Sequence, residues 1–390
     1  MAIMRPSELL LRCARACVGT EPVEGTPELL RQVTDWEYLF RLASRHSIAP
    51  LVSHLVNQID ASELPQSFLK QLQAASRNRA RRSLELTAGL LRLLDLFELN
   101  SIPALAFKGP VLASSLYGDV GLREFVDLDI LIRREDVLRA KDVLLAHGYR
   151  TDLPAEPARQ AAYLRARHEL HFTPEDGAYL IEIHQAFLAP FYCFAYDYES
   201  LWQRLERQPF CGREILALAP DDLLLVLCAH GAKHSWARLG WLCDVARLLF
   251  VSGQELDWPK ITDRASSLGA SRMVLLGLFL AGHLLRAPVP AEILERADKD
   301  KSVTRLAGRV VKSLFGRGSA VGDLRGHLFF LRARERFRDK LGYCSRLAFM
   351  PTEEDRSVLS LPSLLSPLYY PLHAIRVAGK YGLTSLRSGS

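Results

Sequence analysis

The spacing of apolar residues divides the chain into three regions. Residues 1–100 repeat apolar positions at helical intervals and predict a helical region. One helix in this region carries an apolar stripe formed by Leu86, Leu90, Leu93 and Phe97. Shorter runs in residues 101–219 predict an α/β core, and residues 220–390 return to helical spacing. We therefore expect a small core with a sheet between two helical regions.

Strands are predicted in three segments of the core. Residues 103–109 form a short apolar run that ends at glycine, and residues 126–132 form a second run bounded by charge. Residues 168–187 alternate apolar and polar positions around a Pro-Glu-Asp-Gly turn, which is typical of a β-hairpin. Helices are expected at residues 110–118, which begin with proline, and at residues 134–148, which end at glycine.

Acidic residues interrupt two of these predicted strands. Asp127 and Asp129 share one face of their strand, because side chains alternate along a strand, and Glu182 stands between Ile181 and Ile183 in the hairpin. Like charges on a covered face repel and lose hydration, so a partner must compensate them. Divalent cations prefer oxygen ligands, and two of them can clamp a phosphoryl group. The alternative is that these acids pair with arginines at a sheet edge.

Composition and charge add few constraints. The chain of 390 residues is 49% hydrophobic and 24% charged, as in an ordinary folded soluble protein. Residues 301–390 carry 16 Lys and Arg against 6 Asp and Glu, which favours a solvated basic face over contact with an anionic partner. The arginine-rich segment 332–340 is expected to be such a solvated helix.

Features of targeting and redox chemistry favour a cytoplasmic protein. The N-terminus has no signal-peptide pattern, and the most apolar stretch, residues 357–379, is interrupted by prolines and charge, so no membrane span is expected. The seven cysteines are scattered without a C-x-x-C pair, which predicts reduced thiols.

Taken together, a strand–glycine–helix unit, a D-x-D strand and a later acidic strand resemble the DNA polymerase beta-like nucleotidyltransferase superfamily. The segments "FKGPVLASSLYGDVGLREFVDLDILI", "LIEIHQAF" and "HGAKHSWARLGWLCDVARLL" are most similar to its bacterial branch often labelled "nucleotidyltransferase family protein". The resemblance implies an α+β fold with a small mixed sheet. It also implies that Asp127, Asp129 and Glu182 bind catalytic Mg²⁺, with Mn²⁺ as a substitute, while an NTP supplies the nucleotide.

Five further positions are candidates for nucleotide contacts. The better-known members carry Gly-Ser where this chain has Lys108 and Gly109, and the lysine together with the helix N-terminus can take over the contact with phosphate. Arg123 either holds a phosphate or pairs with a nearby acid. Lys233 and Asp244 resemble a family motif, but Asp244 has the alternative of pairing with Arg238 or Arg247, and the nearby tryptophans favour a core role.

Two E-x-H pairs, Glu169/His171 and Glu182/His184, raise the question of zinc. Each pair shares one face of a strand, but no cysteine is suitably spaced. Hydrogen-bonded histidines are therefore favoured over a zinc site, with His184 as a residue that orients Glu182.

The function expected from the sequence is Mg²⁺-dependent transfer of a nucleoside monophosphate from an NTP to a hydroxyl-type acceptor, a small molecule or protein rather than nucleic acid. The alternative is a non-catalytic nucleotide-binding or partner-binding module that retains the fold. Because clustered acids repel one another, we also expect Asp129→Asn to leave the metal-free protein at least as stable as the wild type.

Overall fold

The computed structural model describes residues 6–22, 30, 33, 35–59, 64–154, 156, 160, 163–165, 167–316, 323–349, 368–373, 375, 376 and 379. Within these residues, no helix combines the length and the apolar character needed to cross a membrane. The segment 357–379 lies largely outside the described residues. All seven cysteines are free, as their spacing predicted.

Helices form the N-terminal part of the chain, as the spacing predicted. They are α1 (Pro6–Val18), α3 (Trp36–Arg45), α4 (Ala49–Val56) and α5 (Gln66–Leu99). The carboxylate of Asp35 accepts a hydrogen bond from the backbone N–H of Tyr38 at 2.8 Å and so caps the start of α3. Helix α5 carries the predicted apolar stripe, and its four members are at most 1% exposed: Leu86, Leu90, Leu93 and Phe97.

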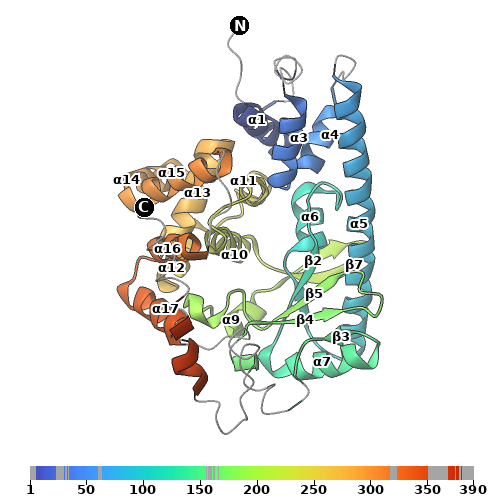
Figure 1. The fold of residues 1–390 in the computed structure, drawn as a ribbon, viewed down its shortest axis with the longest axis vertical. Coiled ribbons are helices and arrows are strands. Elements are labelled where there is room, and N and C mark those ends of the chain that lie inside the picture. Colours follow the sequence, from blue (N-terminus) through green and yellow to red (C-terminus); the bar gives the residue numbers. More distant parts are fainter. Residues whose placement is uncertain are drawn as a thin grey trace.

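A five-stranded mixed sheet lies beside α5 (Figure 1). In sheet order the strands are β1 (Ala104–Ala106), β2 (Asp127–Ile132), β5 (Leu180–His184), β4 (Glu169–Thr173) and β3 (Arg150–Thr151). Strands β2 and β5 run parallel, and the other neighbouring pairs are antiparallel. The predicted hairpin is the pair β4–β5. This sheet and its helices confirm the predicted α+β fold.

The two faces of the sheet differ because side chains alternate along each strand. One face packs against α5 and against α7 (Val137–Ala146) through a core that includes Leu128, Ile130, Ile181 and Ile183. The opposite face carries Asp127, Asp129, Glu182 and His184. Leu131 on this second face belongs to a separate core shared with the C-terminal helices. The charged face is thus covered by α6 (Gly109–Tyr117) and by helices that follow residue 219.

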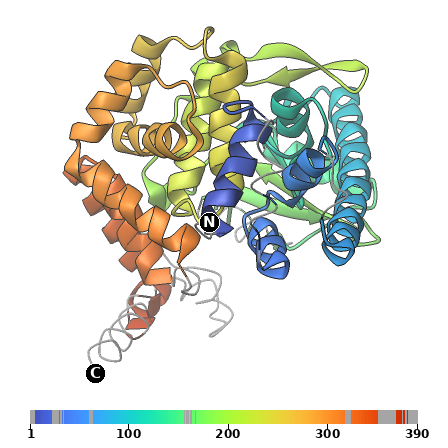
Figure 2. The ribbon, with the colours of Figure 1, turned by 90° about the horizontal axis from the view of Figure 1, so that it is seen from above.

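Helices dominate the C-terminal part of the chain. They are α10 (Pro220–Lys233), α11 (Leu239–Ser252), α12 (Trp258–Ser267), α13 (Ser271–Leu285), α14 (Ala291–Lys299), α15 (Lys301–Phe315), α16 (Asp323–Ala333) and α17 (Phe337–Phe349). Seen from above, α12–α17 occupy one half of the molecule, and the sheet with α5 occupies the other (Figure 2). One continuous core joins Leu9 in α1 to Tyr343 in α17, so the N-terminal and C-terminal helices pack together.

Two local features depart from the sequence expectations. A short helix α9 (Tyr198–Gln203) is followed by a hairpin of β6 (Glu206–Phe210) and β7 (Arg213–Ala217), which the pattern did not predict. The expectation of a solvated helix through residues 332–340 is wrong, because the chain leaves the helical conformation between α16 and α17. Arg334 there is 0% exposed and donates hydrogen bonds to Asp339 and to the carbonyl of Leu268, so a buried ion pair breaks the helix.

Candidate active site

The pairing of strands brings the predicted carboxylates together. In the parallel pair β2–β5, Asp129 lies directly opposite Glu182, and Asp127 precedes Asp129 on the same face. In the antiparallel pair β5–β4, His171 lies opposite Glu182, so these side chains form a row across three strands. A second row, one pleat further, contains His184 and Glu169. Alternation therefore places every acid of these two rows on the same side of the sheet.

Asp129 is the most buried carboxylate of the group, at 6% exposure. Its Oδ1 accepts hydrogen bonds from Nζ of Lys108 at 2.9 Å and from Nε2 of His184 at 3.1 Å. Burial alone would raise the pKa of the Asp129 carboxyl, but the Lys108 ammonium and the His184 hydrogen bond hold it well below its usual range. Asp129 is therefore ionised, and in this conformation it is paired with the Lys108 ammonium group.

Asp127 has the opposite electrostatic environment. Burial, followed by the charges of Asp129 and Glu182, raises the pKa of Asp127 to about 6. Glu182 contributes Oε2 at 3.3 Å from Nε2 of His184. Asp129, Glu182 and His184 each offer one ligand atom within 4.8 Å of the other two, so this group could hold a metal ion, and Asp127 lies on the same face of the sheet. A divalent cation would relieve the repulsion at Asp127.

The turn between β1 and α6 presents Lys108 and Gly109 to this site. Gly109 has φ +56°, in the left-handed region that favours glycine, and a Cβ at this position would lie 3.4 Å from the carbonyl oxygen of Asp127. Lys108 lies 5.0 Å from the centre of the Phe107 ring. The positive φ, rather than lack of space for a side chain, is therefore what favours glycine at the start of α6.

Arg123 and Asp244 bind each other. The Nε of Arg123 donates to both carboxylate oxygens of Asp244 at 3.0 Å, and the hydroxyl of Tyr117 donates to Oδ1 at 3.0 Å. Asp244 is 2% exposed, and the alternative that it pairs with Arg238 or Arg247 is wrong. The pair connects α11 to the loop before β2, so the C-terminal helices fix the position of Arg123.

The end of α10 also faces the carboxylates. Burial lowers the pKa of Lys233, while the charge of Glu169 opposes that shift. Burial, and next the charge of Lys108, holds the pKa of His230 well below its usual value. Trp236 is fully buried, and a Cβ added to Gly231 would collide with its ring, so this tryptophan is a core residue, as its residue type favoured.

Comparison with known proteins identifies the family of this chain. A family model described as an uncharacterised nucleotidyltransferase matches residues 32–286. The chain belongs to this nucleotidyltransferase family. The matched residues include all eight predicted site positions, from Lys108 to Asp244. No curated protein and no solved structure gave a match.

Some residues near the candidate site were not singled out from the sequence. Tyr117 ends α6, and nothing in its local pattern indicates a hydrogen bond to a residue in α11. His168 stands just before β4, outside the alternation that drew attention to Glu169 and His171. Tyr192 lies 5.9 Å from Nζ of Lys233, measured to the ring centre. Each contact joins segments distant in sequence or outside regular elements, where periodicity carries no information.

Proposed function

We propose that this protein transfers a nucleoside monophosphate from an NTP to a hydroxyl-type acceptor and releases pyrophosphate. Asp127, Asp129 and Glu182 would hold the divalent cation, Mg²⁺ or Mn²⁺. The observation that carries this proposal is the parallel register that sets Asp129 beside Glu182, with Asp127 on the same face. Burial, followed by the charges of Asp129 and Glu182, raises the pKa of Asp127 although Lys108 and Arg123 oppose that shift, so a further cation would stabilise the ionised carboxylates.

The cation would neutralise charge on the triphosphate and on the departing pyrophosphate. Groups of the protein would bind the phosphate oxygens that the cation does not contact. Lys108 leaves Asp129 for a phosphate oxygen when the cation occupies the carboxylates, and the N-terminus of α6 adds its N–H groups. Arg123, fixed by Asp244, adds a guanidinium near the same site.

Glu182 would accept the proton of the acceptor hydroxyl. The acceptor oxygen then forms a bond to the α-phosphorus, the bond between the α-phosphorus and the bridging oxygen breaks, and pyrophosphate leaves with the electron pair. His184, 3.3 Å from Glu182, orients that carboxylate. The reaction needs no reactant other than the NTP and the acceptor hydroxyl.

One observation favours a second candidate function, a module that binds nucleotide without turnover. Lys108 already neutralises Asp129 at 2.9 Å, and an ammonium that stays there would occupy a ligand of the cation. In that case an NTP would bind but its α-phosphate would not be transferred.

Label transfer separates the two candidates. The purified protein is incubated with each α-labelled NTP, with Mg²⁺ or Mn²⁺, and with acceptor extracts. The transferase should incorporate α-label but no γ-label into an acceptor, and Asp129→Asn should abolish incorporation. The matched control Asp142→Asn, an exposed position on α7, should retain it. Thermal stabilisation by Mg²⁺–NTP without label transfer would support the binding module and overturn the transferase.

A further inference from the structure

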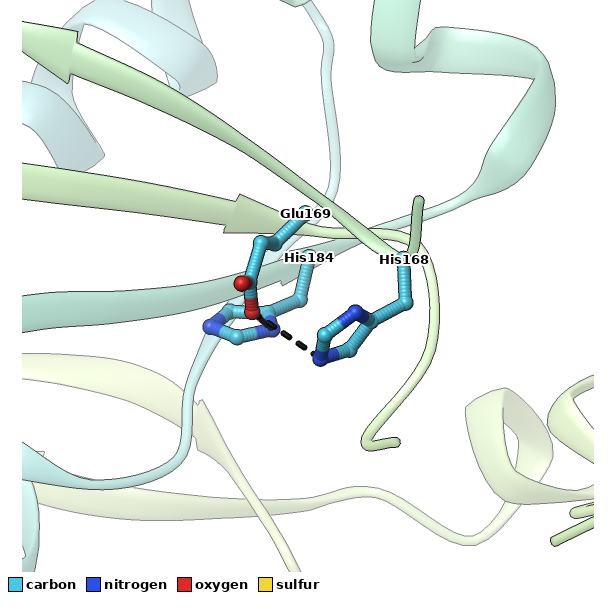
Figure 3. A group of neighbouring side chains, drawn as sticks. All are labelled: His168, Glu169 and His184. Atoms are coloured by element: carbon cyan, nitrogen blue, oxygen red, sulfur yellow. Dashed lines mark ion pairs between the residues drawn. The ribbon is translucent and has the colours of Figure 1, made fainter. Parts of the chain in front are cut away.

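A second cluster of side chains that could bind a metal ion lies beside the carboxylates. His168 immediately precedes β4, Glu169 begins β4, and His184 ends β5 directly opposite Glu169 (Figure 3). Nε2 of His168 lies 2.9 Å from Oε2 of Glu169, and Nδ1 of His184 lies 3.7 Å from the same oxygen. One ligand atom from each residue lies within 4.8 Å of the other two. The antiparallel register thus gathers two imidazoles and one carboxylate.

The nitrogen atoms that face this point lack hydrogen-bond partners among the described residues. Nε2 of His168 and Nδ1 of His184 are both buried, on side chains that are 6% and 3% exposed. The short contact between His168 and Glu169 does not have hydrogen-bond geometry. Nε2 of His171 is also buried without a partner, 3.7 Å from Oε1 of Glu169. A buried polar atom without a hydrogen bond is costly, so a ligand shared by His168, Glu169 and His184 would stabilise these nitrogen atoms.

We propose that His168, Glu169 and His184 bind a transition-metal ion, with Zn²⁺ as the best match. Two neutral imidazoles and a carboxylate are a recurrent zinc ligand set, and bonds of about 2.0–2.1 Å in a tetrahedron separate neighbouring ligands by about 3.4 Å. The separations of 2.9 and 3.7 Å bracket that value. Imidazole donors distinguish this site from the all-oxygen set of Asp127, Asp129 and Glu182.

His184 connects the two sites. With Nδ1 on the metal, its Nε2 carries the proton and donates to Asp129 at 3.1 Å, which is the carboxylate–histidine–metal arrangement that fixes a ligand tautomer. A bound ion would therefore hold the ring that orients Asp129.

Cobalt absorption tests this proposal without any nucleotide. Full-length protein is stripped with a chelator and titrated with Co²⁺, whose visible absorption is intense in tetrahedral sites with imidazole ligands. Wild type should bind one Co²⁺ per chain, and Zn²⁺ should displace it. Both His168→Ala and Glu169→Gln should weaken Co²⁺ binding by more than the roughly 10–100-fold typical of residues that only orient a ligand. Circular dichroism verifies that each variant is folded.

Two controls locate the ion. His147→Ala changes an exposed histidine of the neighbouring α7 end and should keep wild-type absorption. Asp129→Asn should still show the absorption at saturating Co²⁺, with affinity reduced by no more than roughly 10–100-fold, because Asp129 contacts only the far nitrogen of His184 and so orients a ligand. The proposal is overturned by a wild type without cobalt absorption, by absorption that survives His168→Ala, or by its loss in Asp129→Asn, which would assign the ion to Asp129, Glu182 and His184. None of these results depends on nucleotidyl transfer, so the two proposals fail separately.

Discussion

The two faces of the five-stranded sheet are built from the same strands but are held by different forces. On the face against α5, Leu93, Ile130 and Ile183 contact many apolar neighbours, and each contact is small and non-directional. On the opposite side, Asp129 of β2 and Asp244 of the nearby helix α11 each accept hydrogen bonds from two identified donors. Free energy is therefore distributed over many contacts on one face and concentrated in a few pairs on the other.

This difference predicts how substitutions behave. On the apolar face, a truncation should cost stability in proportion to the volume removed and should leave the folded fraction active. On the charged face, replacing one carboxylate by the matching amide should either reduce activity or remove the stability contributed by one ion pair. Four predictions, in decreasing order of expected effect, test this division.

The largest effect is expected from Glu182→Gln, which removes one charge and no volume. Because the proposed cation and proton transfer both require this carboxylate, nucleotidyl transfer should fall on the order of 10⁴-fold, or about 5 kcal/mol in activation free energy. The melting temperature should change little. Glu175→Gln, in the turn of the same hairpin, is the control, since its side chain is 79% exposed. Equal activity of the two variants would remove Glu182 from the reaction.

Asp244→Asn should have the next largest effect, on stability. It leaves the buried guanidinium of Arg123 without its charged partner, which typically costs about 3–5 kcal/mol. Urea unfolding in the absence of nucleotide measures the loss, with the exposed pair residue Asp298→Asn as control. If Asp244 served only the nucleotide, the metal-free protein would be as stable as wild type, and the structural role given to the pair would be refuted.

Leu93→Ala tests the apolar face. Removing this fully buried side chain from α5 should lower the free energy of unfolding by roughly 2–5 kcal/mol, whereas Leu84→Ala, at a 62% exposed position of the same helix, should change it by less than about 0.5 kcal/mol. The kcat of the folded fraction should remain that of wild type. A loss of kcat at full folding would show that the two faces are coupled.

Much of the fold could be predicted because its signals are local. Alternation in 126–132 and 168–187, and the helical stripe of α5, each depend on neighbouring residues, and these elements were found where expected. The hairpin β6–β7 was missed because its turn, Cys211–Gly212, takes φ angles of 47° and 82° at a residue pair that lacks a typical turn sequence at its first position. Helix α16 ends early because of a buried ion pair that no spacing rule reveals.

The position of three candidate carboxylates on one sheet face could be predicted in part, but their interactions could not. The shared face of Asp127 and Asp129 follows from alternation, but their partnership with Glu182 required the parallel pairing of β2 with β5. The partners of Asp244 lie 121 and 127 residues away, where sequence patterns give no guidance. From the sequence, we expected charge repulsion to disfavour ionisation of Asp127 and Asp129 alike. The structure assigns it to Asp127 alone, since Lys108 and His184 compensate Asp129.

That assignment reverses the expected behaviour of Asp129→Asn in metal-free protein. The pKa of Asp129 is lowered in the folded state, so its charge contributes stability above the unfolded pKa of about 3.9, and the asparagine variant should be less stable at neutral pH. For Asp127 the sign is opposite. Its folded pKa of about 6 exceeds the unfolded value, so the folded state binds more protons between about pH 4 and 6, and the free energy of unfolding falls as pH rises through that window.

Asp127→Asn should therefore have the smallest and most specific effect, a gain of stability that depends on pH. In chelator, the variant should match wild type near pH 4 and exceed it by roughly 1–3 kcal/mol above pH 6, because the asparagine carries no charge for Asp129 and Glu182 to repel. Urea unfolding of wild type, Asp127→Asn and Asp129→Asn across this range measures the three curves. Adding Mg²⁺ should reduce the advantage of Asp127→Asn, since only wild type retains the full set of ligands. A difference between the first two curves that stays constant with pH would show that Asp127 does not bear the repulsion.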